Sequence, residues 1–199
     1  MIDRRAFDGI VEALRDAGYA DADIEWSENC EPPASAEAFA RETIFVICNS
    51  GMKNTVARGI FDRVRAALAR GDSARTVFNH PGKARAIDDI WARREEYFAG
   101  FLAAADPLEY CASIPWVGPI TKYHLAKNFG AQVAKPDVHL QRLAALEDTT
   151  PQALCERLAQ ESGFKVATVD VLLWRACAVG IIDSRTGVIH APQPLPVES

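Results

Sequence analysis

The sequence lacks any apolar run that approaches the roughly 20 residues a helix needs to cross a bilayer. Residues 1–18 mix acidic and basic side chains and contain no small-residue cleavage site. Such a beginning is typical of a surface helix and not of a signal peptide. We therefore expect a protein that has no membrane partner and resides in the cytoplasm.

Clustered cysteines are also lacking. The five cysteines lie far apart, and no two of them share a Cys-x-x-Cys spacing: Cys30, Cys48, Cys111, Cys155 and Cys177. An odd number at such distances argues against a disulfide framework, and an iron–sulfur loop needs clustered cysteines. We expect buried or surface thiols in a reducing compartment, with no metal site and no iron–sulfur cluster.

The sequence also lacks an excess of basic residues. The net charge of -5 counts against a nucleic-acid binder, because such proteins usually carry basic residues that neutralise phosphates. A binding face is nevertheless a local property. Acidic residues gather within residues 21–31, while residues 118–136 contain Lys122, Lys127 and Lys135 and no acidic residue. The segment 118–136 therefore remains a candidate for phosphate contact.

Apolar residues recur at helical spacing along nearly the whole chain. Phe7, Ile10 and Leu14 belong to one such stripe, which Gly18 ends as a C-cap. Short helices joined by loops of a few residues predict an all-α fold, a compact orthogonal helical bundle. We expect a single helical domain over residues 1–190, with two lobes and a central cleft as an alternative form. A disordered, proline-rich tail is expected over residues 191–199.

Capping residues, prolines and glycines predict the helix boundaries. The β-branched run within residues 42–50 favours a strand by propensity, but no partner strand is evident, so we expect a helix. Residues 21–33 are expected to form a loop. The further helices are expected over 35–50, 56–71, 81–102, 107–114, 119–130, 137–146, from 151 onward, and 166–181. The core is expected to hold Trp26, Trp91, Trp116 and Trp174, and solvent to surround Lys83 and Arg142.

A glycine-containing turn before residue 119 predicts a phosphate site. Pro119 stands in the first turn of an expected helix, whose first backbone N–H groups have no partner within that helix. These donors and the positive end of the helix dipole favour an anion. Gly118 lets a phosphate approach the backbone closely. Thr121 and Lys122 follow one turn later, where a hydroxyl and an ammonium group add to the contact.

A carboxylate begins the next expected helix. Asp137 follows Lys135 and Pro136 directly, and the dipole and nearby N–H groups of a helix N-terminus favour an ionised carboxylate. Aspartate is also a favoured N-cap residue, so a purely structural capping role is the alternative.

These two features together resemble a known family. The resemblance rests on Ile114-Pro115-x-Val117-Gly118, a helix to Phe129-Gly130, and Pro136-Asp137-Val138-His139-Leu140-x-Arg142. This pattern resembles the hairpin and following aspartate of the helix-hairpin-helix/GPD DNA glycosylases, which include endonuclease III, MutY, the 8-oxoguanine glycosylases and the alkylpurine glycosylases. Upstream, residues 45–50 resemble the family's helix and DNA-inserting loop, and residues 78–87 resemble its Lys-Ala-x-x-Ile helix start. The resemblance covers residues 44–146 in the family's order.

The resemblance implies a function and a set of site residues. It implies a monomeric base-excision repair enzyme that acts on double-stranded DNA containing a modified base, with Asp137 as the catalytic carboxylate. No cofactor is implied, although the hairpin carbonyls of such proteins hold a monovalent cation. The implied DNA contacts are Val117, Gly118, Ile120, Thr121, Lys122 and His139, and the implied base-flipping wedge is Asn49, Ser50 and Met52.

Two departures from the family pattern bear on mechanism. Trp116 stands where the family hairpin usually has glycine, so an indole must tolerate that backbone conformation or the hairpin differs. Ile120 stands where the lyase members carry the lysine that forms a Schiff base. We therefore expect a monofunctional enzyme that hydrolyses the N-glycosidic bond and leaves an intact abasic site.

Three other interpretations remain open. The first is a bifunctional glycosylase/lyase that uses a lysine from another position. The second is a non-catalytic helix-hairpin-helix module that only clamps DNA phosphates. The third is a helical interaction protein without a nucleic-acid role, which the net charge of -5 favours. In the last two, His139 and Asp137 are structural residues.

Overall fold

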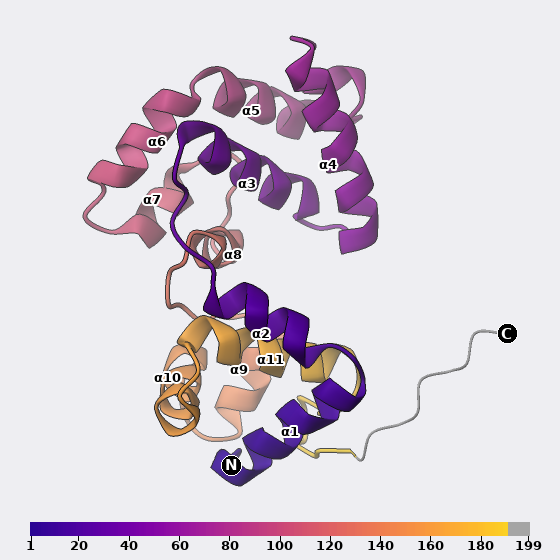
Figure 1. Ribbon diagram of the computed structural model, residues 1–199, viewed down its shortest axis with the longest axis vertical. Coiled ribbons are helices and arrows are strands. Elements are labelled where there is room, and N and C mark those ends of the chain that lie inside the picture. Colours follow the sequence, from indigo (N-terminus) through magenta and orange to yellow (C-terminus); the bar gives the residue numbers. More distant parts are fainter. Residues whose placement is uncertain (191–199) are drawn as a thin grey trace, which may run out of the picture. The chain divides into compact units, whose positions relative to one another are not determined.

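The computed structural model describes residues 1–190, and the regular secondary structure of this part of the chain is helical (Figure 1). It contains eleven α-helices and one short 3₁₀ helix, and its only β-type pairing is a single antiparallel bridge between Ile182 and Ile189. The expected all-α fold is therefore confirmed for the described residues. The predicted tail at 191–199 lies outside them.

The chain divides into two compact units. The terminal unit consists of residues 1–30 and 130–199, and the central unit consists of residues 31–129. The terminal unit contains α1 (Arg4–Asp16), α2 (Ala20–Glu28), α9 (Val138–Ala145), α10 (Pro151–Ser162) and α11 (Val166–Ala178). The central unit contains α3 (Ala36–Asn49), α4 (Asn54–Ala69), the 3₁₀ helix η1 (Ala74–Thr76), α5 (Pro81–Ala92), α6 (Arg94–Ala103), α7 (Pro107–Ser113) and α8 (Thr121–Asn128).

Both ends of the described chain contribute to the core of the terminal unit. The indigo helices α1 and α2 lie against the orange helix α11, and α10 packs against α1 and α11 (Figure 1). The stripe of α1 that the sequence predicted is buried here, with Phe7, Ile10 and Leu14 fully inaccessible. They pack with Leu154 of α10 and Leu172 of α11 in one hydrophobic cluster. Apolar burial therefore joins segments that are far apart in the sequence.

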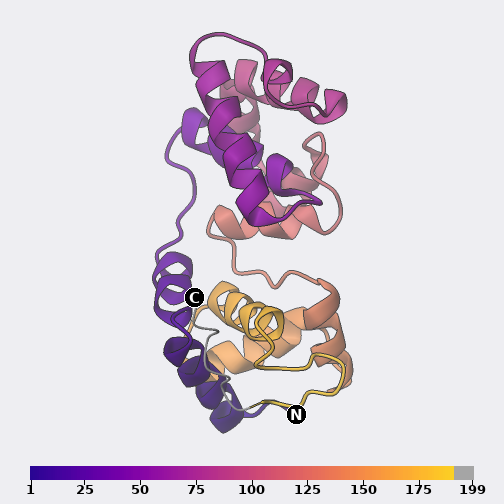
Figure 2. The same cartoon turned by 90° about the vertical axis from the view of Figure 1, so that its right-hand side faces the viewer.

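Helix α3 is the centre of the central unit. It packs against α4, α5, α6 and α8, which surround it in Figures 1 and 2. Its Phe39 ring is fully buried and stacks on Phe129 with 5.0 Å between ring centroids. Phe101 lies 5.5 Å from the same ring. The β-branched run of residues 42–50 is buried within this helix, so the preference for helix over strand is confirmed.

Helix α2 contradicts the expected loop over residues 21–28, whereas residues 29–33 contain no helix. Its apolar pattern is weak and it lacks a side-chain N-cap, so local signals alone do not reveal it. Tertiary contacts stabilise it instead. Arg175 of α11 forms a two-point ion pair with Asp23, with N–O distances of 2.8 and 3.0 Å. The Thr168 hydroxyl donates a hydrogen bond to the Glu28 carboxylate at 2.6 Å.

Two other expectations need correction. The helix expected over 81–102 is interrupted at Arg93, where α5 ends and α6 begins. The expected core position of the tryptophans is wrong for Trp26, Trp116 and Trp174, which are 46%, 48% and 37% exposed, and Trp91 is only half-buried. The Arg175 guanidinium lies over the Trp174 ring, 5.1 Å from its centroid.

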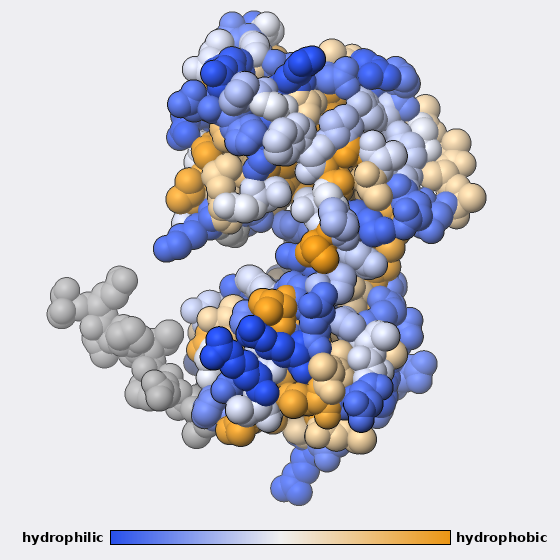
Figure 3. Space-filling view, turned by 180° about the vertical axis from the view of Figure 1, so that it is seen from behind, coloured by the Kyte–Doolittle hydropathy of each residue, from blue (hydrophilic) through white to orange (hydrophobic). Residues whose placement is uncertain are grey.

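On the face that Figure 3 shows, the described residues are mainly hydrophilic, and hydrophobic side chains lie in small separate patches. Within residues 1–190, no helix is both long and apolar enough to cross a bilayer. No disulfide joins any of the five cysteines, all of which lie in the described part of the chain.

Candidate functional site

The hairpin segment lies between α7 and α8 in the central unit. Helix α7 ends at Ser113, and α8 begins at Thr121, two residues after the expected start at Pro119. The backbone nevertheless turns earlier, since the Val117 N–H bonds the Ile114 carbonyl at 3.0 Å and the Lys122 N–H bonds the Gly118 carbonyl at 2.9 Å. The chain therefore reverses within residues 114–120.

Trp116 adopts a backbone conformation that glycine occupies more readily than other residues. Its φ is +67°, in the left-handed region that side chains rarely occupy. The indole ring lies over Gly82 in the first turn of α5, where an added Cβ would be 2.4 Å from the ring. The ring also meets His80 edge to face, with centroids 4.9 Å apart. Packing on α5 offsets the backbone strain, so the hairpin accommodates tryptophan at this position.

The remaining hairpin residues differ in what they expose. Val117 is buried, so only its backbone is available to a ligand, whereas Ile120 is exposed. Gly118 has open space around its Cα, because an added Cβ would meet no atom within 4 Å. Thr121 is half-buried at the start of α8. This arrangement leaves the Gly118 side of the turn accessible to a phosphate.

Lys122 already has an anionic partner within the chain. Its ammonium group lies 2.5 Å from a carboxylate oxygen of Glu109 on α7. This hydrogen bond raises the pKa of Lys122 above its ordinary value. The Lys122 side chain is 15% exposed and the Glu109 side chain 64%, so Glu109 is the more accessible partner. A phosphate that binds Lys122 must therefore compete with Glu109.

The expected wedge residues follow the end of α3. Asn49 is the last residue of α3, Ser50 is its C-cap, and the Met52 N–H bonds the Asn49 carbonyl at 3.1 Å in a tight turn. The Lys83 ammonium group donates to the Ser50 carbonyl oxygen at 2.6 Å. Lys83 is only 6% exposed, so its expected solvation is wrong, and burial lowers its pKa.

The first turn of α5 thus connects two segments that the sequence predicted separately. Gly82 receives the Trp116 indole of the hairpin, and the next residue, Lys83, holds the Ser50 carbonyl of the wedge turn. The resemblance implied only a helix start here. The burial of a lysine in that turn carried no signal in the sequence, because its partner lies 33 residues away.

Asp137 is the N-cap of α9 in the terminal unit, as the sequence predicted. Its backbone is extended, with φ -79° and ψ 175°. One carboxylate oxygen, Oδ1, accepts the N–H groups of His139 at 2.9 Å and Leu140 at 3.1 Å. The residue is half-buried. The helix N-terminus therefore fixes the orientation of the carboxylate and compensates its charge.

Two further groups lie near Asp137. The imidazole Nδ1 of His139 lies 3.0 Å from the Ser184 hydroxyl, so this ring already has a partner in the terminal unit. Burial, followed by the negative charges of Asp137 and Asp183, raises the pKa of the Cys177 thiol to about 12. Backbone hydrogen bonding from Arg185 holds the pKa of Asp183 below its usual value. Asp137 and Asp183 therefore both act electrostatically on the Cys177 thiol.

The segment that leads to Asp137 is attached to α11 by a buried acid. Asp170 is 1% exposed, and its carboxylate accepts the Lys135 N–H at 2.7 Å. Asp170 is not among the site residues that the sequence predicted. An available signal was its position as the one charged residue within residues 166–174, where burial of a charge requires a partner.

No cofactor or metal site is defined by side chains in the described residues. No group of three or more histidine, cysteine or acidic side chains there has the geometry of a metal site. The hairpin carbonyls of Ile114 and Gly118 each accept one backbone N–H and retain a second lone pair. The monovalent cation that the resemblance implies stays a prediction.

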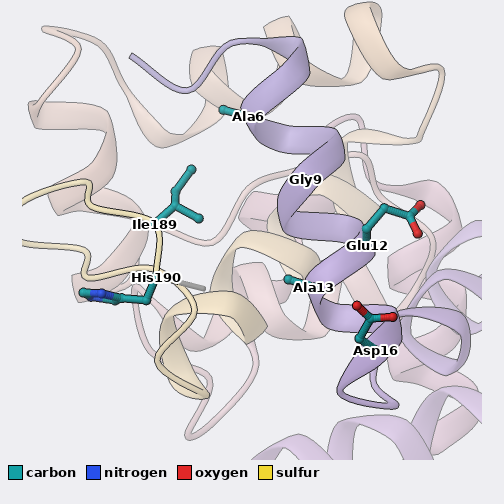
Figure 4. Close-up of a pocket in the computed structure, with 7 residues that line it drawn as sticks. All are labelled: Ala6, Gly9, Glu12, Ala13, Asp16, Ile189 and His190. Atoms are coloured by element: carbon teal, nitrogen blue, oxygen red, sulfur yellow. The ribbon is translucent and has the colours of Figure 1, made fainter. Parts of the chain in front are cut away.

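A hollow on the terminal unit contains none of the predicted site residues (Figure 4). Five positions of α1 and two residues after α11 line it: Ala6, Gly9, Glu12, Ala13, Asp16, Ile189 and His190. The Glu12 carboxylate is ion-paired with Arg15 at 2.5 Å. We assign no role in the candidate site to this hollow.

No protein-family model, no curated protein and no solved structure matches the chain. The functional interpretation therefore depends on the motif residues and on their geometry.

Proposed function

We propose that this protein is a monofunctional DNA glycosylase that hydrolyses the N-glycosidic bond of a modified base in double-stranded DNA. The single observation that supports the proposal is the environment and position of the Asp137 carboxylate. This carboxylate is half-buried, oriented by two backbone N–H groups at the start of α9, and stands at the motif position of the catalytic aspartate.

The proposed chemistry uses the negative charge of Asp137. A base within the stack is out of reach, so the nucleotide is first flipped out of the duplex, which is easiest for damaged or mispaired bases. As the base leaves, positive charge develops on the sugar. The fixed carboxylate stabilises that charge and orients the attacking water, without reorganisation during the reaction. His139 is the neighbouring candidate for DNA contact in this scheme.

The hairpin of the central unit supplies the proposed phosphate contacts. The backbone at Gly118 is open, and the turn leads directly into α8, where the positive end of the helix dipole favours an anion. Such contacts fix the register of a protein on DNA without reading the sequence. This part of the proposal includes the helix-hairpin-helix assignment of residues 107–128.

The wedge turn and Ile120 define two further parts of the proposal. Asn49, Ser50 and Met52 are proposed to fill the gap left by the flipped base, and the buried Lys83 holds their turn to α5. Ile120 has no amine with which to form a Schiff base, and the nearby Lys122 ammonium is engaged by Glu109. We therefore propose that the product is an intact abasic site.

A panel of duplexes, each with one modified base, tests the proposed function. The purified protein is expected to release at least one of these bases, and borohydride is expected to trap no protein–DNA adduct. A strong trapped adduct would show lyase chemistry and overturn the monofunctional assignment. Duplex binding without release of any base would instead support a non-catalytic DNA clamp.

Asp137→Asn tests the assignment of the carboxylate. Asparagine still caps a helix, so the variant is expected to fold and bind DNA but to lose most base release. Asp3→Asn is the matched control, because Asp3 caps α1 through the Ala6 N–H at 2.8 Å and lies in the same unit. A wild-type rate in Asp137→Asn, or an equal loss in Asp3→Asn, contradicts the assignment.

A further inference from the structure

Asp170 is a buried carboxylate in an apolar stretch of α11. It is 1% exposed, and its neighbours Val169 and Val171 are also buried. Transfer of a carboxylate into such surroundings is unfavourable unless hydrogen bonds or charges compensate it. A leucine or valine at this position would avoid that penalty, so the acid requires an explanation in its contacts.

One hydrogen bond of Asp170 connects it to the backbone that leads to Asp137, the proposed catalytic residue. The Asp170 Oδ1 accepts the Lys135 N–H at 2.7 Å, and the Lys135 carbonyl accepts the Asp137 N–H at 2.8 Å. The two bonds form a continuous chain from the interior of α11 to the backbone of Asp137. Residue 136 is a proline and has no N–H group. The Lys135 amide is therefore the last one before Asp137 that a side chain is able to hold.

Other polar side chains hold the earlier part of the same segment. Gln152 of α10 accepts the Ala134 N–H at 2.7 Å and donates to the Gln132 carbonyl at 3.3 Å. Gln132 in turn accepts the Ala167 N–H at 3.3 Å. These bonds secure residues 132–134, but the bond from Asp170 acts closest to Asp137. The final approach of the chain to α9 thus depends on a buried acid.

We infer that Asp170 is a positioning residue for Asp137: it holds the Lys135 peptide and thereby sets the place from which the catalytic carboxylate faces the sugar. The inference rests on the proposed glycosylase function. A displacement of about 1 Å in a reacting group reduces rates by as much as about 100-fold, so a backbone anchor at this point affects chemistry more than binding.

Two substitutions of Asp170 separate its hydrogen bond from its charge. Asp170→Ala removes the acceptor for the Lys135 N–H, and its rate of base release at saturating protein is expected to fall by up to about 100-fold. Its affinity for the same duplex is expected to stay unchanged. Asp170→Asn retains an oxygen that accepts the N–H and is expected to recover most of the rate. Equal losses in the two variants contradict the inference.

Thr168→Val is the matched structural control. Thr168 is also a fully buried polar residue of α11, but its hydroxyl bonds Glu28 rather than the segment before α9. This variant is expected to lose thermal stability while it keeps the rate of base release per folded molecule. In the double variant Asp137→Asn/Asp170→Ala, the rate is expected to equal that of Asp137→Asn alone, because Asp170 acts through Asp137. An additive loss overturns the inference.

Amide hydrogen exchange tests the inference independently of activity. Asp170→Ala is expected to accelerate exchange at His139 and Leu140, whose N–H groups bond Asp137, whereas Thr168→Val is expected to leave these two amides unchanged. If Asp170→Ala does not fold, amide exchange is measured in Asp170→Asn instead. In this variant the His139 and Leu140 amides are expected to stay protected. A wild-type protein inactive on every duplex overturns the glycosylase proposal, while unaltered exchange in folded Asp170→Ala overturns the positioning role.

Discussion

The two units of this protein differ in charge. Residues 31–129 contain 13 basic and 11 acidic residues and carry a net +2, whereas residues 1–30 and 130–199 contain 9 basic and 16 acidic residues and carry -7. The overall charge of -5 is thus a property of the terminal unit. The central unit, which holds the hairpin, is weakly basic. The total charge of a protein is therefore a poor argument against DNA binding when most of its excess acidic residues lie in one unit.

The units also differ in how they hold their proposed functional groups. In the central unit, the hairpin and the wedge turn are both attached to the first turn of α5, through Trp116 and Lys83. In the terminal unit, one carboxylate is held by its own helix and by the backbone chain that ends at Asp170. We therefore expect substitutions in the central unit to change binding and substitutions in the terminal unit to change chemistry.

The largest expected effect separates chemistry from binding. Asp137→Asn is expected to lower the rate of base release at saturating protein by about 100- to 1000-fold, because one preorganised charge is lost. Lys122→Glu is expected to leave that rate unchanged and to weaken duplex binding. Single-turnover assays with both variants measure the two effects. If both variants lower the rate of base release, or if both weaken duplex binding, the proposed division of function between the units is wrong.

The second effect is on the stability of the central unit. Lys83→Met removes the donor to the Ser50 carbonyl and is expected to lower the free energy of unfolding by about 1–3 kcal/mol. Denaturant titration measures it, and Arg85→Gln, at an exposed position of the same helix, is the control.

The burial of Lys83 also predicts that the free energy of unfolding depends on pH. Burial lowers its pKa in the folded protein, so the penalty for its charge is fully present below that folded pKa. The penalty is relieved as pH rises from the folded value toward the ordinary value of 10.5. Stability that Lys83 contributes should therefore increase over this interval in the wild type and not in Lys83→Met. A parallel pH profile in the two proteins contradicts the burial of this ammonium group.

A smaller effect concerns the ion pair of the hairpin. Glu109→Gln releases Lys122 from its carboxylate partner and is expected to raise duplex affinity several-fold and to steepen its salt dependence. Lys122→Glu is expected to flatten that dependence by about one unit of slope. Glu95→Gln removes an equal charge from another exposed position of the central unit and serves as the control. Equal gains in Glu109→Gln and Glu95→Gln show a general charge effect and no hairpin contact.

The smallest expected effect reports the charge of Asp137 without DNA. Because this charge helps to raise the pKa of Cys177 to about 12, Asp137→Asn is expected to lower that pKa and to speed alkylation of Cys177 at alkaline pH. Peptide mapping after iodoacetamide treatment measures the rate at this cysteine. Asp148→Asn is the control for a change in net charge alone. An unchanged rate in Asp137→Asn argues against an ionised carboxylate beside the thiol.

Local signals were sufficient for the features that depend on neighbours in the chain. A helix and its cap involve residues within about four positions of each other, so apolar spacing and cap residues predicted α1, α3 and the start of α9 at Asp137. The spacing of the cysteines likewise predicted no disulfide framework, and none is present among the described residues. The glycosylase activity and the DNA contacts stay predictions, because they depend on a ligand as well as on the chain.

The sequence by itself determined the helical class, most of the helices and the capped carboxylate of Asp137, since each follows from periodicity or from contacts within one turn. The tertiary structure alone decided that α2 is a helix, that Trp116 is exposed on α5, that Lys83 is buried and that Asp170 holds the Lys135 peptide. Each of these depends on partners that are distant in sequence, where burial and hydrogen bonding override the preference of the isolated residue.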